Sequence, residues 1–384
     1  MDARYFRFAV FYFFYYAALG AYTPYVGRWV DALGHSGYVV GGMLVLWYGT
    51  RIIAPPLWTG FTSSSATPGH WLVYGAGLTT LLFAGFLLAR EAWQLLAVMA
   101  VFGLFFNAIM PQFEAMTLTE LGEQRTQYGR IRVWGSIGFL IVASSFGWLM
   151  DRLGNASFVW LSLPLFLGLL CTSWLHRRDR QPESQEAPTS LAKSLRRRGV
   201  KSFLMVALLM QLAFGPFYVF FTLHLQREGH DGLDIGVLWG LGVLIEILLF
   251  WHAPRLMEKY GAQRLLGFCL AVTVARWLMT AFFAASLPLM ALTQASHAFS
   301  FAIFHACCMQ RIGELFPPRE VAAGQSLLYG FSSGLGGVLG AGMAAAMWEW
   351  RGGTAAFVAG AMVAAIAWGF HFASCRARER ASAA

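Results

Sequence analysis

The chain has 384 residues, of which 58% are hydrophobic and only 12% are charged, and its formal net charge is +9. A soluble globular domain carries roughly 25% charged residues, so this composition excludes that class and indicates an integral membrane protein. The positive charge does not indicate a nucleic-acid partner, because the basic residues lie between apolar runs and form no basic module interleaved with aromatics.

Twelve apolar runs follow one another along the chain, each near the ~20 residues that a helix needs to cross a bilayer. The first run comes after a short basic start without a small-residue cleavage site, so we expect a retained span and not a signal peptide. Six runs lie near 8–26, 38–59, 71–89, 93–119, 131–150 and 156–175, and six near 202–226, 233–253, 264–284, 287–310, 321–347 and 354–374. The predicted fold is an all-α integral membrane protein of twelve transmembrane helices.

A polar, proline-bearing and strongly charged segment separates the two sets of runs. Such a composition is typical of an interdomain linker. We therefore predict an N-terminal six-helix bundle at 1–175, a cytoplasmic linker at 176–201 and a C-terminal six-helix bundle at 202–384.

The distribution of basic residues predicts the orientation of the spans. If both termini are inside, the inner segments hold 21 Lys and Arg, and Arg51 and Arg276 lie within spans. The outer loops then hold 5, which are Arg28, Arg90, Arg152, Arg227 and Arg351. Because basic residues favour cytoplasmic loops, both termini are predicted to be cytoplasmic.

An internal repeat becomes visible when the chain is shifted by 195 residues. The shift aligns Gly20 with Gly215, Gly34-His35-Ser36-Gly37 with Gly229-His230-Asp231-Gly232, and Gly41 with Gly236. It also aligns Arg51 with Glu246, so equivalent positions in two spans carry opposite charges. Two six-helix halves of the same topology are the arrangement of major facilitator transporters.

Ionisable residues inside the predicted spans are candidates for function, because a charge at the bilayer centre costs at least ~2.5 kcal/mol. Glu246 lies well inside its span. Arg276 is mid-span, where a permanently charged guanidinium needs a carboxylate partner or an anionic ligand. Arg51 lies nearer the inner surface, so it either lines a cavity or extends to the interface as an anchor.

Four further ionisable residues leave two interpretations open. Glu114 and Arg132 flank the loop between the fourth and fifth spans, where they form either a substrate-facing pair or two interfacial anchors. His297 and His305, eight residues apart in the tenth span, either carry protons or are buried neutral histidines held by backbone carbonyls. Polar residues that could line a cavity or serve helix packing are Tyr15, Tyr22, Asn107, Gln112, Gln211 and Tyr218.

These features together resemble the major facilitator superfamily over nearly the whole chain. The run YGRIRVWGS, with Glu114 18 positions before Arg132, is similar to the lactose permease branch and the related phenylpropionate permeases. The segments around Glu246 and Arg276 and the two histidines of the tenth span look most similar to the phenylpropionate permease group.

The resemblance implies that Glu114 and Arg132 bind substrate and that Arg276 and His297 belong to proton coupling. Ser300 departs from this pattern, because it stands where lactose permease has an essential glutamate three residues after the histidine. We therefore expect Glu246 to carry the proton instead. The loop GFTSSSATPGHW also lacks the Asp-Arg-Gly-Arg signature that is common in the superfamily.

We expect a proton-coupled symporter that works by alternating access around a central cavity, as a monomer in the inner membrane of a bacterium. The expected substrate-binding residues are Glu114, Arg132, Arg51 and Arg276, and the expected proton-coupling residues are Glu246, His297 and His305. Three arginines against two carboxylates leave a surplus positive charge, which favours a small organic anion such as a phenylpropionate-like aromatic carboxylate. The alternative is a proton-coupled sugar or nucleoside permease.

Two other classes fit the sequence less well. A non-transporting membrane sensor would need a folded output domain, and the segment 176–201 is too short for one. An intramembrane enzyme would need a nucleophile–base or metal motif such as His-Glu-x-x-His, which the sequence lacks. The five cysteines show no metal-ligand spacing, so we expect no cofactor.

Overall fold

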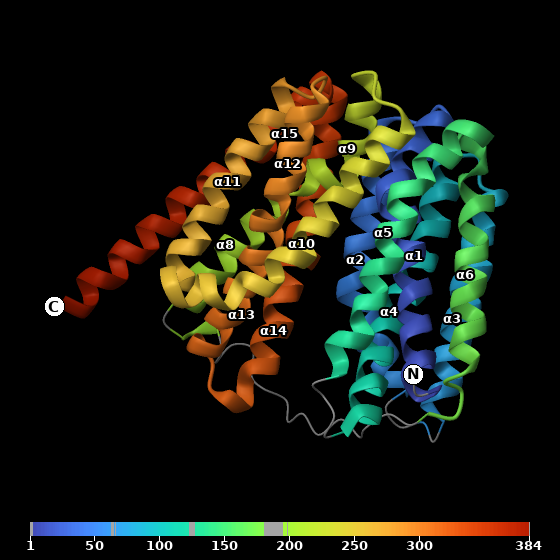
Figure 1. Ribbon diagram of the computed structural model, residues 1–384, viewed down its shortest axis with the longest axis horizontal. Coiled ribbons are helices and arrows are strands. Elements are labelled where there is room, and N and C mark those ends of the chain that lie inside the picture. The colour runs from blue at the N-terminus through green and yellow to red at the C-terminus, as the bar shows by residue number, and fades with distance from the viewer. Residues whose placement is uncertain are drawn as a thin grey trace. The chain divides into compact units, whose positions relative to one another are not determined.

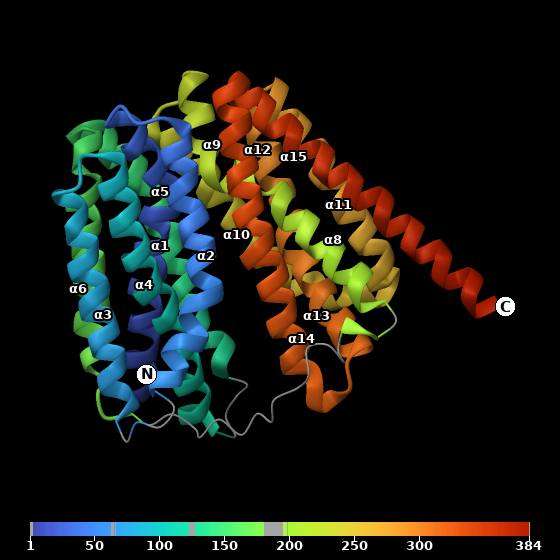
Figure 2. The same cartoon turned by 180° about the vertical axis from the view of Figure 1, so that it is seen from behind.

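The structure is a computed structural model, and it describes residues 3–62, 65, 67–122, 127–179, 195–197 and 199–383. Every regular element within these ranges is a helix (Figures 1 and 2). A helix forms hydrogen bonds between its own backbone N–H and C=O groups. The hydrocarbon of a bilayer offers these groups no hydrogen-bond partners, so a helix suits this environment. The predicted all-α class is therefore confirmed for the described part of the chain.

The long helices of the first half follow the predicted runs closely. They are α1 (Ala3–Ala32), α2 (Gly37–Thr62), α3 (Pro68–Ala84), α4 (Ala92–Leu121), α5 (Tyr128–Leu153) and α6 (Phe158–Trp174). Short 3-10 turns at Gly85–Leu87 and Asn155–Ser157 follow α3 and α5.

The helices of the second half are more often interrupted. They are α8 (Val200–Ala213), α9 (Gly215–Arg227), α10 (Gly232–Tyr260), α11 (Ala262–Phe282), α12 (Leu287–Ala298), α13 (Phe304–Leu315), α14 (Val321–Tyr329) and α15 (Gly337–Ala383). Two π-helical stretches, Phe299–Ile303 and Gly330–Gly336, join α12 to α13 and α14 to α15. The long α15 contains non-helical backbone at Arg351 and Gly352, where two helices meet at a kink.

Ten helices in the described ranges are long and apolar enough to cross a membrane. The first helix, α1, is not one of these ten, and the last of them, Val321–Ala377, has 57 residues and includes the kink in α15. A multi-pass membrane protein is therefore confirmed, and the number of twelve spans stays a prediction.

The chain divides into two compact units. The first is Met1–Gln185 with Asp231–Gly240, and the second is Glu186–His230 with Leu241–Ala384. Most of the predicted linker at 176–201 lies outside the described residues, so the domain boundaries stay a prediction. The start of α10 belongs to the first unit, where the Gly232 N–H donates a hydrogen bond of 2.6 Å to the Asp151 carboxylate.

Glycines aligned by the sequence repeat allow equivalent helix crossings. A Cβ on Gly20 of α1 would lie 2.8 Å from the carbonyl oxygen of Phe139 in α5. A Cβ on Gly215, at the start of α9, would collide with the backbone of Gly340 in α15. Small residues at such crossings let membrane helices approach closely.

The repeated Gly-His pairs also have the same local structure in both halves. Gly34 and Gly229 adopt φ values of 84° and 95°, a left-handed backbone that glycine tolerates without strain. The imidazole that follows each glycine bonds a loop carbonyl: His35 Nε2 lies 2.8 Å from Arg90 O, and His230 Nε2 lies 2.7 Å from Ala284 O. The repeat in the sequence therefore corresponds to a repeated turn in the structure.

One end of the first unit is held by an ion-pair cluster. Arg7 of α1 bonds the Asp179 carboxylate at 2.7 Å and Glu120 of α4 at 3.2 Å, and His176 bonds Asp179 at 2.8 Å. Burial alone would raise the pKa of Asp179, but its hydrogen bonds from His176 and Arg7 outweigh burial and lower that pKa below its ordinary value. The cluster ties the start of α1 to the ends of α4 and α6.

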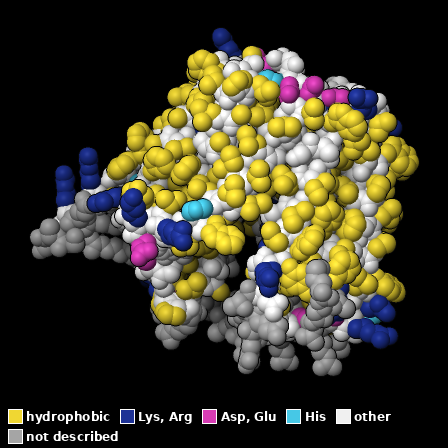
Figure 3. All heavy atoms as spheres, viewed as in Figure 1, with side chains coloured by type: hydrophobic (Ala, Val, Ile, Leu, Met, Phe, Trp, Pro, Cys, Tyr) yellow, Lys and Arg dark blue, Asp and Glu magenta, His cyan; other side chains and the backbone are white. Residues whose placement is uncertain are grey.

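The helix surfaces are suited to lipid. Large apolar side chains such as Leu88, Trp93 and Trp251 are more than two-thirds exposed. On the face drawn in Figure 3, hydrophobic side chains cover the helices along their length, and most charged side chains gather near helix ends. This pattern is the reverse of a soluble protein's surface and agrees with a membrane environment.

Candidate functional site

A polar cluster in the first unit is built on α1, α4 and α5. Arg132 lies over the ring of Tyr16, with its guanidinium carbon 3.9 Å from the ring centre, and 5.7 Å from the centre of Tyr12. Tyr128 donates a hydrogen bond of 3.2 Å to the Glu114 carboxylate. Glu114 and Arg132 lie close enough for their charges to interact. The structure thus brings together the two residues that the sequence paired.

A glycine on α5 makes room for this arrangement. A Cβ on Gly135 would lie 2.6 Å from the Tyr16 ring and 2.9 Å from Arg132 Nη1. Any larger residue would push the arginine away from the tyrosine. Nearby, the buried Tyr12 hydroxyl faces the hydroxyls of Thr117 and Tyr128. Hydroxyl groups therefore lie beside Glu114 and Arg132, where a polar ligand could bond.

Arg51 and Arg130 differ from Arg132. Arg51 is an exposed residue on α2, and its charge acts on Tyr15, Tyr16 and Tyr48. Arg130 is also exposed, and its backbone carbonyl accepts a hydrogen bond from Tyr5. Of these three arginines, Arg132 is the one that the structure places against aromatic rings.

The second unit contains a deeply buried arginine. Arg276 of α11 is 1% exposed and donates one hydrogen bond, from Nη1 to Ser300 Oγ at 3.1 Å. Its guanidinium lies 4.3 Å from the Trp277 ring centre and 4.6 Å from that of Phe217. Its Nε and Nη2 are buried without hydrogen-bond partners in the described part of the chain. A permanently charged group with free donors in an apolar, aromatic setting is stabilised when an anion binds to it.

His297 lies near this arginine, and Glu246 lies next to His297. His297 Nε2 is 3.8 Å from Glu246 Oε2, and the charge of Arg276 acts on His297. The glycine at 242, one turn before Glu246, leaves space there: a Cβ on Gly242 would lie 3.7 Å from the His297 ring. The structure thus brings Arg276, His297 and Glu246 into one cluster, as their predicted roles require.

The π-helical stretch between α12 and α13 shapes this second cluster. It places Ser300 Oγ between Arg276 and the His297 carbonyl, which it reaches at 3.1 Å. Wide turns of this kind often occur at functional sites. His305 lies beyond the stretch and contacts the Tyr329 ring, with centroids 6.2 Å apart, so its described contact is away from His297.

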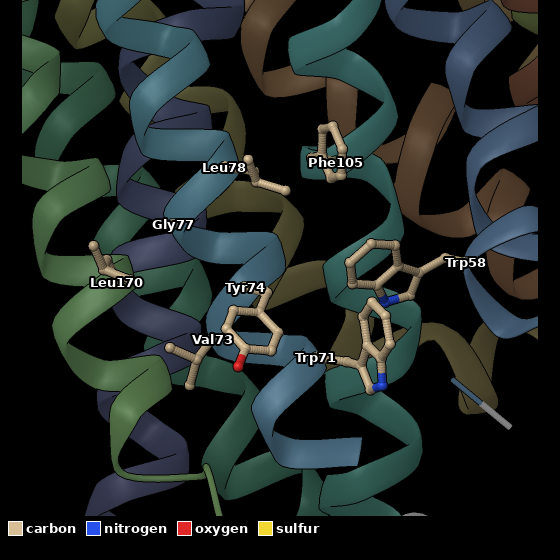
Figure 4. A pocket seen from close by; sticks show the side chains of 8 residues that line it. All are labelled: Trp58, Trp71, Val73, Tyr74, Gly77, Leu78, Phe105 and Leu170. Atoms are coloured by element: carbon tan, nitrogen blue, oxygen red, sulfur yellow. The ribbon is translucent and has the colours of Figure 1, made fainter. Parts of the chain in front are cut away.

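An apolar pocket elsewhere in the first unit holds none of the predicted site residues (Figure 4). It has a volume of about 550 Å³ and opens between α2, α3, α4 and α6. Its walls include Trp58, Trp71, Tyr74 and Phe105, and the Trp58 indole is already bonded to Gln112 at 2.6 Å. The pocket offers no charge to a polar substrate.

A model of the MFS_1 like family matches residues 5–359. The chain belongs to this family. It is therefore a transporter of the major facilitator type, embedded in a membrane as a multi-pass protein.

Two curated relatives align in sequence with most of this chain. A probable 3-phenylpropionic acid transporter of Escherichia coli (strain K12) is 28% identical over 315 residues, which are 79% of this chain and 81% of the relative. A maltose permease of Geobacillus stearothermophilus is 27% identical over 338 residues, which are 86% of this chain and 84% of the relative.

Solved structures share the fold at low identity. A structure of the nucleoside transporter NupG aligns with a TM-score of 0.82 at 14% identity, covering 97% of this chain and 99% of that one. A bacterial homologue of the lysosomal transporter Spinster aligns with a TM-score of 0.72 at 14% identity, covering 97% of this chain and 96% of that one.

Sequence reasoning missed the tyrosines that surround the pair in the first unit. Tyr12, Tyr16 and Tyr128 were hidden among many aromatics. The signal for Tyr12 and Tyr16 was their four-residue spacing, which places both on one face of α1. By contrast, Asn107 and Tyr22, which the sequence offered as cavity-lining candidates, bond within the bundle: Asn107 to Thr50 at 2.9 Å and Tyr22 to Met99 at 2.9 Å.

Proposed function

We propose that this transporter is a proton-coupled symporter of a small organic anion, and that the anion is an aromatic carboxylate of the phenylpropionate kind. The observation that carries the proposal is Arg276: a buried guanidinium with two unpartnered nitrogens, lined by the rings of Trp277 and Phe217. A carboxylate would take the free donors in a forked contact, and an aromatic ring would fit among the neighbouring rings. The E. coli relative is named for an acid of this class.

Glu246 is the proposed proton carrier, with His297 as its neighbour. Their 3.8 Å separation is within ion-pair distance, and a negative Glu246 would offset the positive charge of Arg276 when the site is empty. Proton uptake by Glu246 would leave Arg276 uncompensated, so the carboxylate of the substrate would bind more tightly. Coupling then follows, because proton and anion each favour the binding of the other.

Glu114, Arg132 and Arg51 are proposed to contact the substrate from the first unit, and His305 is proposed to belong to the proton path. The proposed carrier has twelve spans in two duplicated halves, at 1–175 and 202–384, with both termini and the linker at 176–201 cytoplasmic. We place it in a bacterial inner membrane, acting as a monomer by alternating access.

A sugar or nucleoside permease is the second candidate. It is favoured by the first-unit cluster, where Glu114 and Arg132 balance each other in charge and the hydroxyls of Tyr12 and Tyr128 lie beside them. Such a cluster suits a neutral, hydroxylated ligand. The maltose permease of G. stearothermophilus is a relative of comparable identity.

Uptake into proteoliposomes separates these candidates. Labelled 3-phenylpropionate, maltose and a nucleoside are each offered with and without an inward proton gradient. We expect gradient-driven accumulation of phenylpropionate only. Accumulation of maltose or the nucleoside instead would show that the substrate is not an organic anion. Uptake that does not depend on the gradient would contradict proton coupling.

A further inference from the structure

A shallow crevice opens at one end of the second unit, between α8, α11, α13 and α15. Its polar lining comes from Ser202, Gln263, Arg311, His371, Ser374 and Cys375. The predicted topology places this end at the cytoplasmic surface. The crevice shares no residue with either polar cluster of the transport site.

The crevice is a formed feature of the helix packing. His371 Nε2 lies 2.9 Å from the Gln263 carbonyl, which joins α15 to α11. Arg311 is paired with Glu314, and its side chain is 12% exposed. Contacts within the bundle therefore hold the walls, among them the hydrogen bond that the Ser202 hydroxyl donates to the Gly199 carbonyl at 3.1 Å.

Basic residues stand next to crevice-lining residues in the sequence. Lys201, Arg264 and Arg376 are exposed, and each is the sequence neighbour of a lining residue. Lys and Arg side chains gather at this end of α10, α11 and α15 in Figure 3. The acidic residues at this end of α10, α13 and α15 are Glu258, Glu314 and Glu379, so basic residues outnumber acidic ones there.

Exposed apolar rings lie on the helices that line the crevice. Phe268 and Phe372 are 50% and 46% exposed. They belong to the same helix pair, because a Cβ on Gly267 would lie 3.3 Å from the Phe372 ring and 3.4 Å from His371. A molecule with an anionic head and hydrocarbon tails would meet donors and charge at the crevice and apolar surface beside it.

We propose that this crevice, the headgroup crevice, binds an anionic phospholipid of the inner leaflet. Its phosphodiester would lie at the mouth, near Lys201, Arg264 and the two serines, and its acyl chains would lie along Phe268 and Phe372. Basic pockets between transmembrane helices on the cytoplasmic side bind such headgroups. The crevice is too shallow to enclose a whole soluble metabolite, which favours a lipid over a free phosphate compound.

Native mass spectrometry of the full-length protein, stripped of lipid in detergent, tests the proposal. Equal amounts of phosphatidylglycerol and phosphatidylcholine are added, and the adducts are counted. We expect a phosphatidylglycerol adduct that survives conditions which remove phosphatidylcholine. Lys201→Gln with Arg264→Gln should reduce this preference by about tenfold or more, since each basic residue near an anionic surface contributes about 1 kcal/mol.

Matched variants separate a specific site from general attraction. Arg130→Gln with Arg178→Gln removes the same charge from the first unit and should leave the preference unchanged. Ser374→Leu fills the crevice without changing charge and should weaken the adduct. Lys201→Arg with Arg264→Lys should retain it, which controls for folding.

Three results would overturn the proposal. One is an equal loss in both glutamine pairs, and another is an adduct unaffected by Ser374→Leu. The third is displacement of the lipid by millimolar inorganic phosphate, which would make the crevice a site for a free anion.

Discussion

Arg132 in the first unit and Arg276 in the second both lie against aromatic rings, but their surroundings balance charge differently. Arg132 shares its cluster with Glu114, and Tyr16 covers it at 3.9 Å. Arg276 has no carboxylate within ion-pair distance among the described residues, and two of its nitrogens lack partners. The first cluster is close to neutral, whereas the guanidinium of the second is left to an anion.

This difference suggests a division of labour between the two clusters. A neutral cluster with hydroxyls can position the polar or aromatic body of a ligand at modest energy. A desolvated arginine with unpartnered donors binds a carboxylate strongly once Glu246 is protonated, because the alternative is then an unpaired buried charge. Most of the binding energy of an anionic substrate should therefore come from the second unit.

The largest expected effect comes from removing the unpaired charge. Arg276→Gln should raise the KM for phenylpropionate by about 30-fold or more, because breaking a buried charge contact costs about 2–5 kcal/mol. Arg276→Lys should recover only part of this, since lysine lacks the forked donor geometry. Initial uptake rates at matched protein amounts measure both. Arg351→Gln, at an exposed arginine, serves as the control. Normal transport by Arg276→Gln would show that Arg276 does not supply most of the binding energy.

The second expected effect concerns coupling. Glu246→Gln mimics the protonated carboxyl, so uphill accumulation should be lost while exchange of internal for external substrate continues. Accumulation under a proton gradient and counterflow without one are measured on the same vesicles. Glu349→Gln, at an exposed acid on α15, should keep both activities. Uphill uptake at the normal rate in Glu246→Gln would show that another residue carries the proton. His297 would then be the first residue to test.

The sequence predicted the elements well because membrane spans are long and apolar. The runs near 38–59 and 71–89 correspond to α2 and α3 within a few residues. Interruptions were not predictable, since the π-helical stretch at Phe299–Ile303 arises from packing and carries no Pro. Arg28 shows the same limit: it was counted in an outer loop, but it lies inside α1, buried, and bonds Asp151 at 2.6 Å.

Charged residues of the candidate site could be predicted because few charges occur inside apolar runs. Its aromatic residues could not, because aromatic residues are common throughout the chain. Arg276, Glu246 and His297 stood out because charged residues inside apolar runs are few. Their mutual proximity depends on the crossing of α10, α11 and α12, which spacing along the chain does not report. Tyr16 and Gly135 could not be selected, because thirteen tyrosines and 41 glycines look alike without a structure.

A smaller effect is expected in the neutral cluster. Tyr16→Leu removes the ring that covers Arg132 and should raise the KM by about tenfold, since a partly desolvated cation–π contact is worth about 1–2 kcal/mol. Tyr16→Phe keeps the ring and should stay near the wild-type value. Tyr22→Phe, whose hydroxyl bonds Met99, is the packing control. If Tyr16→Leu weakens transport as much as Arg276→Gln, the binding energy is shared and the proposed division fails.

The smallest expected effect lies outside both clusters, at Asp179. Its pKa is lowered in the folded protein, so it binds fewer protons when folded than when unfolded. The stabilisation from Arg7 and His176 is therefore fully present above the ordinary value near 3.8 and is lost as the pH falls through the lowered value. Asp179→Asn should lower Tm at pH 7 by about 1 °C, because a partly exposed pair contributes about 1 kcal/mol or less. Thermal unfolding in detergent from pH 7 to pH 3 should show the difference between wild type and variant shrinking toward acid. A difference that stays constant with pH would mean that Asp179 acts by packing alone, and the ion-pair cluster would then play no part in holding α1 against α4 and α6.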